Sequence, residues 1–465
     1  MLKNIDFQKL YDQHENYFER SISTERVTHS RIIKSIDRKG SDFDVEIAGR
    51  SIEGRIIQSI TLGKGKKNIL LWSQMHGDEP TATAALFDLF NFFSCDDQFS
   101  DFKKMILNKL SMTFIPMLNP DGAECHSRVN RINVDVNRDA LRRITPEAEI
   151  LWKYSDRLRP EFGFNLHDQN SYYTAGRSGK SSAISMLAPP FNFANEINES
   201  RKQSMQVISA INNVLGNLIP GHIARYKDDH EPRSFGDNFI GTGISSILIE
   251  SGFIIGDRNK DLIRKLNFIS LLAALNTIAD ESYKKINFQD YYSIPENQSL
   301  LFDLLIRNVY SVSNGTSYKV DIGINREKKF DQDSNSFFYK GKIAEIGDLS
   351  VYKGIEEHDL NGFTVEPGRV FEKEFRSMPE NSEIDQLLKS GYCTIRLEPG
   401  AIGSNYSEKP INIVPSFSKY SPIIAVDEPA NLILTDNKTG FTVLNGFLIP
   451  SDLSKNSILN GIVIS

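Results

Sequence analysis

The chain has 465 residues, of which 40% are hydrophobic, so it is long enough to form two or three domains with buried cores. Its 54 Lys and Arg against 60 Asp and Glu give a formal net charge of −6, which offers no electrostatic attraction to nucleic acid or to an anionic membrane. No apolar run reaches the ~18–20 residues needed to cross a bilayer. We therefore expect neither nucleic acid nor a membrane as a partner.

The cysteine content and the first residues indicate a reducing compartment. Cys95, Cys125 and Cys393 are few and odd in number, so they cannot all pair within one chain, and no CxxC motif is present. Residues 1–20 are polar and mixed in charge, without the apolar segment of a secretory signal. We expect a cytoplasmic protein with free thiols.

Short apolar runs alternate with longer amphipathic patterns from residue 68 onward. Strands are predicted at residues 68–74, 112–117, 162–166 and 246–249, and helices from Pro80, from Thr145 and over 261–283. The NPDG segment at residues 119–122 predicts a tight turn. Residues 1–60 are expected to form an N-terminal extension with a helical start and two short strands, near 43–47 and 55–61. The alternation favours an α/β domain with a largely parallel or mixed sheet.

A different pattern begins near residue 287. Residues 287–299 are typical of a connection, and from Val309 short alternating stretches are separated by Gly and Asn turns. We therefore divide the chain into an α/β domain over residues 1–286 and a smaller all-β domain over residues 287–465. Since His358 is the only histidine of the second domain, we expect that domain to supply no metal ligand.

Residues suited to metal chemistry follow three of the predicted strands. His76 and Glu79 lie in HGDE after residues 68–74, His167 follows FGFNL and Glu250 follows SSILI. A lone HxxE occurs often by chance, but in open α/β sheets the functional site lies at the carboxyl ends of the strands. We therefore expect these side chains to meet. Two imidazoles and a carboxylate suit a catalytic zinc ion, which keeps one position open for water.

Between these strands lies the segment NPDGAECHSRVNRINVDVNRD, residues 119–139. HxxE, NPDG, an Arg, a D-x-N-R run, a His after a strand and a strand-terminal Glu, in that order, resemble the zinc carboxypeptidase family typified by carboxypeptidase A. The short spacing from Arg128 to Asn137 is similar to that of its bacterial branch, which includes murein-peptide amidases. The resemblance covers about residues 68–252 and implies a mixed, eight-stranded-type sheet with helices on both faces.

The resemblance implies one Zn²⁺ per chain, held by three side chains: His76, Glu79 and His167. Asp135 would accept a hydrogen bond from His76 and so fix the tautomer of that ligand. Zinc lowers the pKa of a bound water from about 15.7 to about 7. Glu250 would take the proton of that water and pass it to the leaving nitrogen.

The resemblance also implies how the substrate is bound. Arg128 would polarise the scissile carbonyl, and Asn137 and Arg138 would bind the terminal carboxylate of the substrate, a task that suits the guanidinium fork. Tyr226 is the candidate for the family's tyrosine that closes over the substrate, although the surrounding RYKDDHEPRSFGD departs from the family pattern. Asn133 stands where the family usually has Gly, which puts the backbone of that loop in doubt.

Together these roles predict a zinc metallocarboxypeptidase that hydrolyses a C-terminal peptide or amide bond, by attack of zinc-bound hydroxide on a peptide-like substrate with a free carboxylate. Two alternatives stay open. One is a zinc deacylase of N-acyl amino acids, similar to aspartoacylase and succinylglutamate desuccinylase, which also carry a C-terminal β domain. The other is a non-catalytic binding protein on the same fold, against which Glu250 argues, because a binding site needs no base. The substrate side chain and the oligomeric state stay open as well.

Three further polar residues near the expected site are interpreted as solvent-exposed. Asp168 directly follows His167, and a solvated loop residue is favoured over its alternatives, a group that supports the ligands or a charge that selects the substrate. His222 and His230 precede the strand that ends in Glu250, and a surface position is favoured for them over a place in the wall of the substrate pocket.

Overall fold

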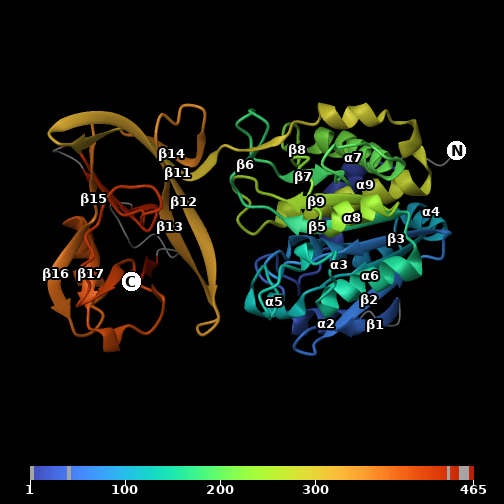
Figure 1. Ribbon diagram of the computed structural model, residues 1–465, viewed down its shortest axis with the longest axis horizontal. Coiled ribbons are helices and arrows are strands. Elements are labelled where there is room, and N and C mark those ends of the chain that lie inside the picture. Colours follow the sequence, from blue (N-terminus) through green and yellow to red (C-terminus); the bar gives the residue numbers. More distant parts are fainter. Residues whose placement is uncertain (1–4, 39–42, 437–439, 450–459, 465) are drawn as a thin grey trace. The chain divides into compact units, whose positions relative to one another are not determined.

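The computed structural model describes residues 5–38, 43–436, 440–449 and 460–464, which form two compact units, Met1–Ser299 and Leu300–Ser465 (Figure 1). The division lies later in the chain than the predicted boundary after residue 286. The segment beyond that boundary still packs on the first unit: the 3-10 helix η4 (Phe288–Ser293) buries Tyr291 completely. The short strand β10 (Asn297–Ser299) then pairs with β6 (Tyr173–Ala175).

The first unit is built on one large sheet. Its strands are β1 (Asp44–Arg50), β2 (Ile56–Leu62), β3 (Lys67–Trp72), β4 (Leu110–Ile115), β5 (Phe162–Asp168), β7 (Ile184–Leu187), β8 (Ile223–Arg225) and β9 (Ser245–Ser251). Over the described residues this sheet has eight strands in the order β1-β2-β4-β3-β5-β9-β7-β8. The central β4-β3-β5-β9 pairings are parallel, whereas β1-β2, β2-β4 and β7-β9 are antiparallel. The predicted mixed sheet is confirmed, and β7 and β8 are additions to the predicted strands.

Helices cover both faces of this sheet (Figure 1). One face packs against α3 (Thr81–Ser94), α4 (Ser100–Lys109), α7 (Glu199–Leu218) and α9 (Asp261–Ala279), and the other against α6 (Pro146–Leu158) and α8 (Phe235–Gly241). Side chains of β3 alternate between the two cores, Ile69 and Leu71 in the first and Leu70 and Trp72 in the second. The predicted helices on both faces are confirmed.

Local sequence signals fix where two of the helices begin. α6 starts as predicted, because the Thr145 side chain accepts a hydrogen bond from the Ala148 amide and Pro146 occupies the first turn. The NPDG segment was predicted as a tight turn, but it opens a short helix instead, α5 (Pro120–Cys125), in which Asn119 accepts from the Gly122 amide. Asn119 therefore caps this helix. Asn side chains make the same kind of hydrogen bond to the backbone in turns.

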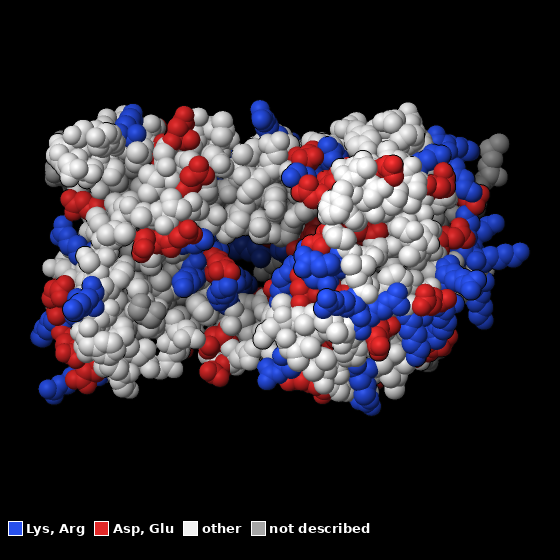
Figure 2. All heavy atoms as spheres, viewed as in Figure 1, with Lys and Arg blue, Asp and Glu red and all other residues white. Residues whose placement is uncertain are grey.

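α9 is long and apolar enough to cross a membrane by length and composition alone. In the structure 83% of its apolar stretch is buried, and the helix packs against α3 and α7. It is a core helix of the first unit. Figure 2 shows acidic and basic side chains mixed over the visible surface of this unit, which agrees with the near balance of charges in the sequence.

The N-terminal segment is an integral part of the first unit. It comprises α1 (Phe7–Asp12), η1 (His14–Asn16), α2 (His29–Asp37) and the edge strands β1 and β2. Asp88 of α3 lies 2.9 Å from His14 Nε2 and accepts a hydrogen bond of 2.7 Å from Arg264 Nε of α9, and all three side chains are buried. These contacts hold the extension against the core helices.

In its described residues the second unit is rich in β structure, as expected, and it contains a helix that was not predicted, α10 (Asn381–Lys389). Its large sheet joins β11 (Leu301–Ser313), β12 (Thr316–Asp331), β13 (Ser336–Gly347), β14 (Lys353–Asp359), β15 (Thr364–Pro367), β20 (Leu432–Thr435), β21 (Gly440–Leu444) and β22 (Phe447–Ile449). Smaller sheets join β16 (Arg369–Phe375), β17 (Tyr392–Leu397) and β19 (Asn412–Pro415), and β18 (Tyr406–Ser407) with β23 (Gly461–Ile462). Among the described residues the other 3-10 turns are η2 (Val136–Arg138) and η3 (Ser282–Lys285) of the first unit and η5 (Pro399–Ala401) of the second.

Candidate active site

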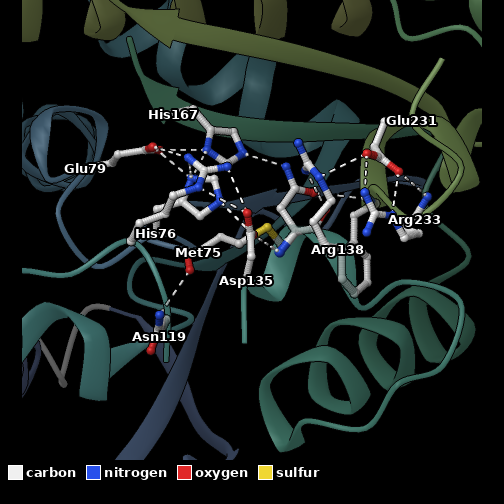
Figure 3. Close-up of polar contacts among 12 residues, drawn as sticks. Met75, His76, Glu79, Asn119, Asp135, Arg138, His167, Glu231 and Arg233 are labelled. Carbon is white, nitrogen blue, oxygen red and sulfur yellow. Dashed lines mark hydrogen bonds and ion pairs between the residues drawn. The ribbon is translucent and has the colours of Figure 1, made fainter. Parts of the chain in front are cut away.

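Three buried side chains converge at the carboxyl ends of β3 and β5. His76 Nδ1 lies 2.8 Å from Glu79 Oε1 and 3.1 Å from His167 Nδ1, and His167 Nδ1 lies 2.7 Å from Glu79 Oε2 (Figure 3). His76 and Glu79 occupy the turn between β3 and α3, and His167 is near the end of the neighbouring strand β5. The structure therefore brings together the three residues that the sequence nominated as ligands.

Gly77 allows this turn to form. A Cβ atom at this position would lie 2.0 Å from the Gly122 carbonyl carbon and 2.2 Å from the Ala123 amide nitrogen of α5. Backbone atoms cannot yield as a flexible side chain can, so only glycine fits between His76 and the helix. The Gly77 amide also donates to Ser127 O at 2.9 Å, which ties the turn to the segment that follows α5.

The donor set fits a zinc ion. Among the described residues this is the cluster of His, Cys, Asp or Glu side chains whose donor atoms, all within 4.8 Å of one another, could hold a metal. Tetrahedral ligands at zinc–nitrogen distances of about 2.0–2.1 Å lie about 3.3 Å apart, close to the separation of the two imidazole Nδ1 atoms. Two imidazoles and one carboxylate also leave a position for water, as in catalytic zinc sites.

Charge within this cluster is closely balanced. Burial acts to lower the pKa of His76, but the carboxylates of Glu79 and Asp135 outweigh it and raise the pKa to about 9. Burial lowers the pKa of His167. Glu79 is the opposite case, because the two histidines overcome the effect of burial and hold its pKa well below the usual range.

Asp135 lies behind His76, where the sequence placed it. Its Oδ1 is 3.0 Å from His76 Nε2 and accepts the Asn137 amide at 2.8 Å. Its Oδ2 accepts from Arg128 Nε at 3.1 Å. The hydrogen bond to Nε2 leaves Nδ1 to face the cluster, which is the tautomer that a metal ligand requires.

Arg128 reaches the same cluster from a half-exposed position. Its Nη1 is 3.2 Å from His76 Nδ1 and 3.4 Å from Glu79 Oε1. The ion pair with Asp135, at 2.9 Å from Nη2, anchors the guanidinium at this place. A donor so held can face negative charge that develops beside the ligand cluster.

Asn137 and Arg138 lie in η2, on the other side of His167. Asn137 Oδ1 accepts from the Phe235 amide at 3.2 Å, and its Nδ2 is 3.5 Å from His167 Nε2. Arg138 Nε lies 3.1 Å from Glu231 Oε2, an ion pair that the sequence analysis did not find. The two residues are therefore held beside the cluster by the segment that precedes α8.

Glu250 is brought to His167 by strand pairing, since the two residues are register partners in β9 and β5. Burial raises the pKa of Glu250 to about 8, and the negative charge of Glu79 adds to this effect. Tyr226 follows β8, with its ring centroid 5.9 Å from that of Tyr173. Burial raises the pKa of Tyr226, and Glu250 adds to the rise.

These groups line one pocket of about 580 Å³. Its walls include the nominated residues His76, Glu79, Arg128, Asn137, Arg138, His167, Tyr226 and Glu250. Asp135 is not among the lining residues and acts from behind His76. The pocket thus places a base candidate, two guanidinium groups and the donor cluster within reach of one bound molecule.

Two of the residues interpreted as solvent-exposed have largely covered side chains. The Asp168 side chain is only 9% exposed, because Thr81 donates to its carboxylate and Lys260 pairs with it at 3.1 Å. The His230 side chain is also 9% exposed, lies 2.9 Å from Asp237 and lines the pocket. Both interpretations were wrong: Thr81 and Lys260, far away in the chain, cover Asp168, and Pro190 O and the nearby Asp237 contact His230. His222 is partly exposed, and its Nδ1 lies 2.8 Å from Ser181 O.

Residues 30–208 match the family model of the zinc carboxypeptidases. Over these residues the chain is similar to the zinc carboxypeptidases. The match contains the three candidate ligands together with Arg128, Asp135, Asn137 and Arg138, and it ends before Tyr226 and Glu250. Zinc is the metal that this similarity implies.

Individual relatives match shorter stretches. Carboxypeptidase SOL1 of Arabidopsis thaliana is 41% identical over 66 residues, 14% of this chain and 13% of that protein. Carboxypeptidase 2 of Trichophyton tonsurans is 24% identical over 139 residues, 28% of this chain and 24% of that protein. Each match thus spans about a quarter or less of the curated relative. The crystal structure of a metallo-carboxypeptidase from Burkholderia cenocepacia aligns with a TM-score of 0.45 and 18% identity, over 56% of this chain and 70% of that one.

Proposed function

We propose that the chain is a zinc-dependent metallocarboxypeptidase that hydrolyses a C-terminal peptide or amide bond of a substrate with a free carboxylate. The observation that supports this most directly is the content of the pocket. One cavity holds both the cluster of His76, Glu79 and His167 and the pair Asn137 and Arg138. The first group suits hydrolysis, and the second suits recognition of a chain end.

His76, Glu79 and His167 would hold the ion, with Asp135 orienting His76. A bound zinc ion supplies Lewis acidity, which activates water and polarises a carbonyl oxygen. A histidine binds a metal through an unprotonated ring nitrogen, and Asp135, by accepting a hydrogen bond from Nε2 of His76, would leave Nδ1 for this purpose.

Glu250 would act as general base and then as general acid. Its raised pKa lies near the working range of an enzyme at neutral pH, where a carboxylate can both accept a proton and return it. A cation in the neighbouring cluster would favour the ionised form and bring this pKa down. Glu250 would take a proton from the attacking water and deliver it to the leaving nitrogen.

Arg128 and Arg138 would each stabilise a different negative charge during the reaction. Arg128 lies against the donor cluster and would face the oxygen of the scissile carbonyl as charge develops on it. Arg138, with Asn137, would bind the terminal carboxylate. Tyr226 lines the same pocket and would close over the substrate.

The test compares matched substrates with the zinc-loaded full-length chain. We expect an N-acylated dipeptide with a free C-terminal carboxylate to be cleaved and the same peptide with a C-terminal amide to be a poor substrate. Equal rates on both would refute the exopeptidase function. Cleavage of simple N-acyl amino acids in preference to dipeptides would identify a deacylase instead. A panel that includes murein peptides would then narrow the class of substrate.

A further inference from the structure

The guanidinium of Arg138 is held on two of its sides and free on the third. Its Nε lies 3.1 Å from Glu231 Oε2, and its Nη1 donates to the Asn137 carbonyl at 2.8 Å (Figure 3). Nη2 makes no hydrogen bond to any residue in the described part of the chain, and 35% of the side chain is exposed. One edge of the guanidinium is therefore fixed while another remains available in the pocket.

Glu231, the partner of Arg138, is itself held rigidly. Arg233 donates to Glu231 Oε1 from Nε at 2.9 Å and to Oε2 from Nη2 at 2.8 Å, a two-pronged contact (Figure 3). The Arg233 amide adds a third bond to Oε1 at 3.1 Å. The contact with Arg233 lowers the pKa of Glu231 to about 2, so this carboxylate is ionised across the neutral range.

The segment that carries Glu231 contacts η2 and its flank at two further points. The Phe235 amide donates to Asn137 Oδ1 at 3.2 Å. The Ala140 amide donates to Arg233 O at 3.1 Å. The segment of residues 231–235 thus contacts Asn137 and Arg138, the two residues that would bind the terminal carboxylate. It also contacts Ala140, which lies just beyond them.

Three other functions for Glu231 fit less well. As a binding group for a substrate ammonium it would need a free acceptor, but both of its oxygens already accept from Arg233. As the catalytic base it would need to lie at the donor cluster, whereas its ion pairs are with Arg138 and Arg233. As a purely structural surface ion pair it would contribute little stability, about 0–1 kcal/mol for exposed pairs.

We propose that Glu231, held by Arg233, is a positioning residue that fixes the Nε edge of Arg138 and leaves Nη2 free to bind the terminal carboxylate of the substrate. This inference rests on the proposed function, since it assumes that Arg138 binds that carboxylate. A flexible arginine would lose side-chain entropy on binding, whereas a pre-oriented fork loses less. Substrate acids should gain from this arrangement, and substrate amides should not.

The experiment measures binding separately from hydrolysis. The background is the zinc-loaded full-length Glu250→Gln protein, and the probes are one N-acetylated dipeptide as the free acid and as the C-terminal amide. We expect Glu231→Ala to weaken binding of the acid about three- to tenfold and to leave that of the amide unchanged. Glu231→Asp should restore part of the loss. Glu46→Ala is the control, because Glu46 pairs with Arg157 in a half-exposed contact away from the pocket.

Undiminished binding of the acid by Glu231→Ala would overturn the inference, and so would an equal loss for acid and amide. Hydrolysis is measured separately, with the zinc-loaded full-length chain that keeps Glu250, here called the parent, and with its Glu231→Ala variant. If the parent cleaves the acid and Glu231→Ala matches its KM, the positioning role fails and the proposed function stands. If the parent cleaves nothing but the acid binds in a Glu231-dependent way, the proposed function fails and the positioning role stands. A loss of kcat at unchanged KM would instead make Glu231 the base.

Discussion

His76 Nε2 lies 3.0 Å from Asp135 Oδ1, on the edge of the ring opposite the Nδ1 atom that joins the donor cluster. Removing this carboxylate should weaken metal binding, because it fixes the ring and its tautomer. We expect Asp135→Asn to lower zinc affinity about 10–100-fold, measured by competition with a chelator. Asp229→Asn is the matched control, since Asp229 lies at the same pocket but is 72% exposed. Equal affinities of the two variants would contradict the role of Asp135.

Glu250 is the proposed base, and Glu231 is the other pocket glutamate that could compete for this role. Glu250→Gln should keep the fold and the zinc while kcat falls by about 10²–10⁴-fold, the contribution of a general acid–base group. Glu231→Gln should retain most of its kcat. Steady-state kinetics with metal analysis of both proteins decides between them, and a Glu250→Gln enzyme with near-normal kcat would show that the base lies elsewhere.

The raised pKa of Glu250 predicts a pH-dependent stability of the metal-free protein. Because the folded pKa of about 8 lies above the ordinary 4.5, the folded state binds the extra proton. Stability from this group is therefore complete at acid pH and is lost as the pH rises toward 8. After chelation, Glu250→Gln should match the parent in denaturant unfolding at pH 5 and exceed it at pH 9. Glu231→Gln should show no such gain, since its pKa is already low in the fold.

Arg138 should matter for substrate acids far more than for amides. Since this side chain is partly exposed, we expect Arg138→Ala to lower kcat/KM for the free acid by about ten- to a hundredfold, below the full cost of a buried charge pair. Arg131→Ala is the control, because Arg131 forms an exposed ion pair with Glu53. An identical loss for acid and amide would mean that Arg138 supports the fold of the pocket and does not read the carboxylate.

The metal site should survive removal of the second unit. All three candidate ligands lie in the first unit, which has hydrophobic cores of its own, and His358 is the only histidine beyond Ser299. A protein of residues 1–299 should therefore fold and bind one zinc ion, as measured by elemental analysis and circular dichroism. A folded fragment that fails to bind zinc would contradict this.

The sequence predicted the position of the candidate site residues best where they directly follow a strand. His76, Glu79, His167 and Glu250 each follow an apolar run, and the parallel pairing of β3, β5 and β9 brings such ends together. The α/β character of the first unit and the β-rich second unit could be predicted because burial leaves a periodic pattern in the sequence. The two helical layers followed from the resemblance to the zinc carboxypeptidases.

The contacts that the sequence did not reveal depend on partners from distant segments. The Asp168 side chain is largely covered because Thr81 donates a hydrogen bond to it and Lys260 pairs with its charge, and nothing in its own neighbourhood indicates either partner. The ion pair of Glu231 with Arg138 joins residues on η2 and before α8, which no periodic pattern relates. Such pairs are visible only once the chain is folded.

The boundary after residue 286 was placed too early for a related reason. The residues that follow it read as a polar connection, yet Tyr291 is fully buried and Asn297 lies in a strand that pairs with β6. Composition marks how polar a segment is. It does not indicate whether the segment packs against a helix or strand that is distant in the sequence.

The neighbouring positions of β3 and β5 in the sheet have a consequence for how the protein matures. His76 and His167 are 91 residues apart in the chain, and β4 together with four helices intervenes between them. No local segment can therefore assemble the site during synthesis, and the proposed ion would be captured tightly only after the long connection between β3 and β5 has folded. The zinc content of the protein would then measure how much of the first unit has folded completely. During folding, zinc binding would appear together with the native sheet and later than the first helices.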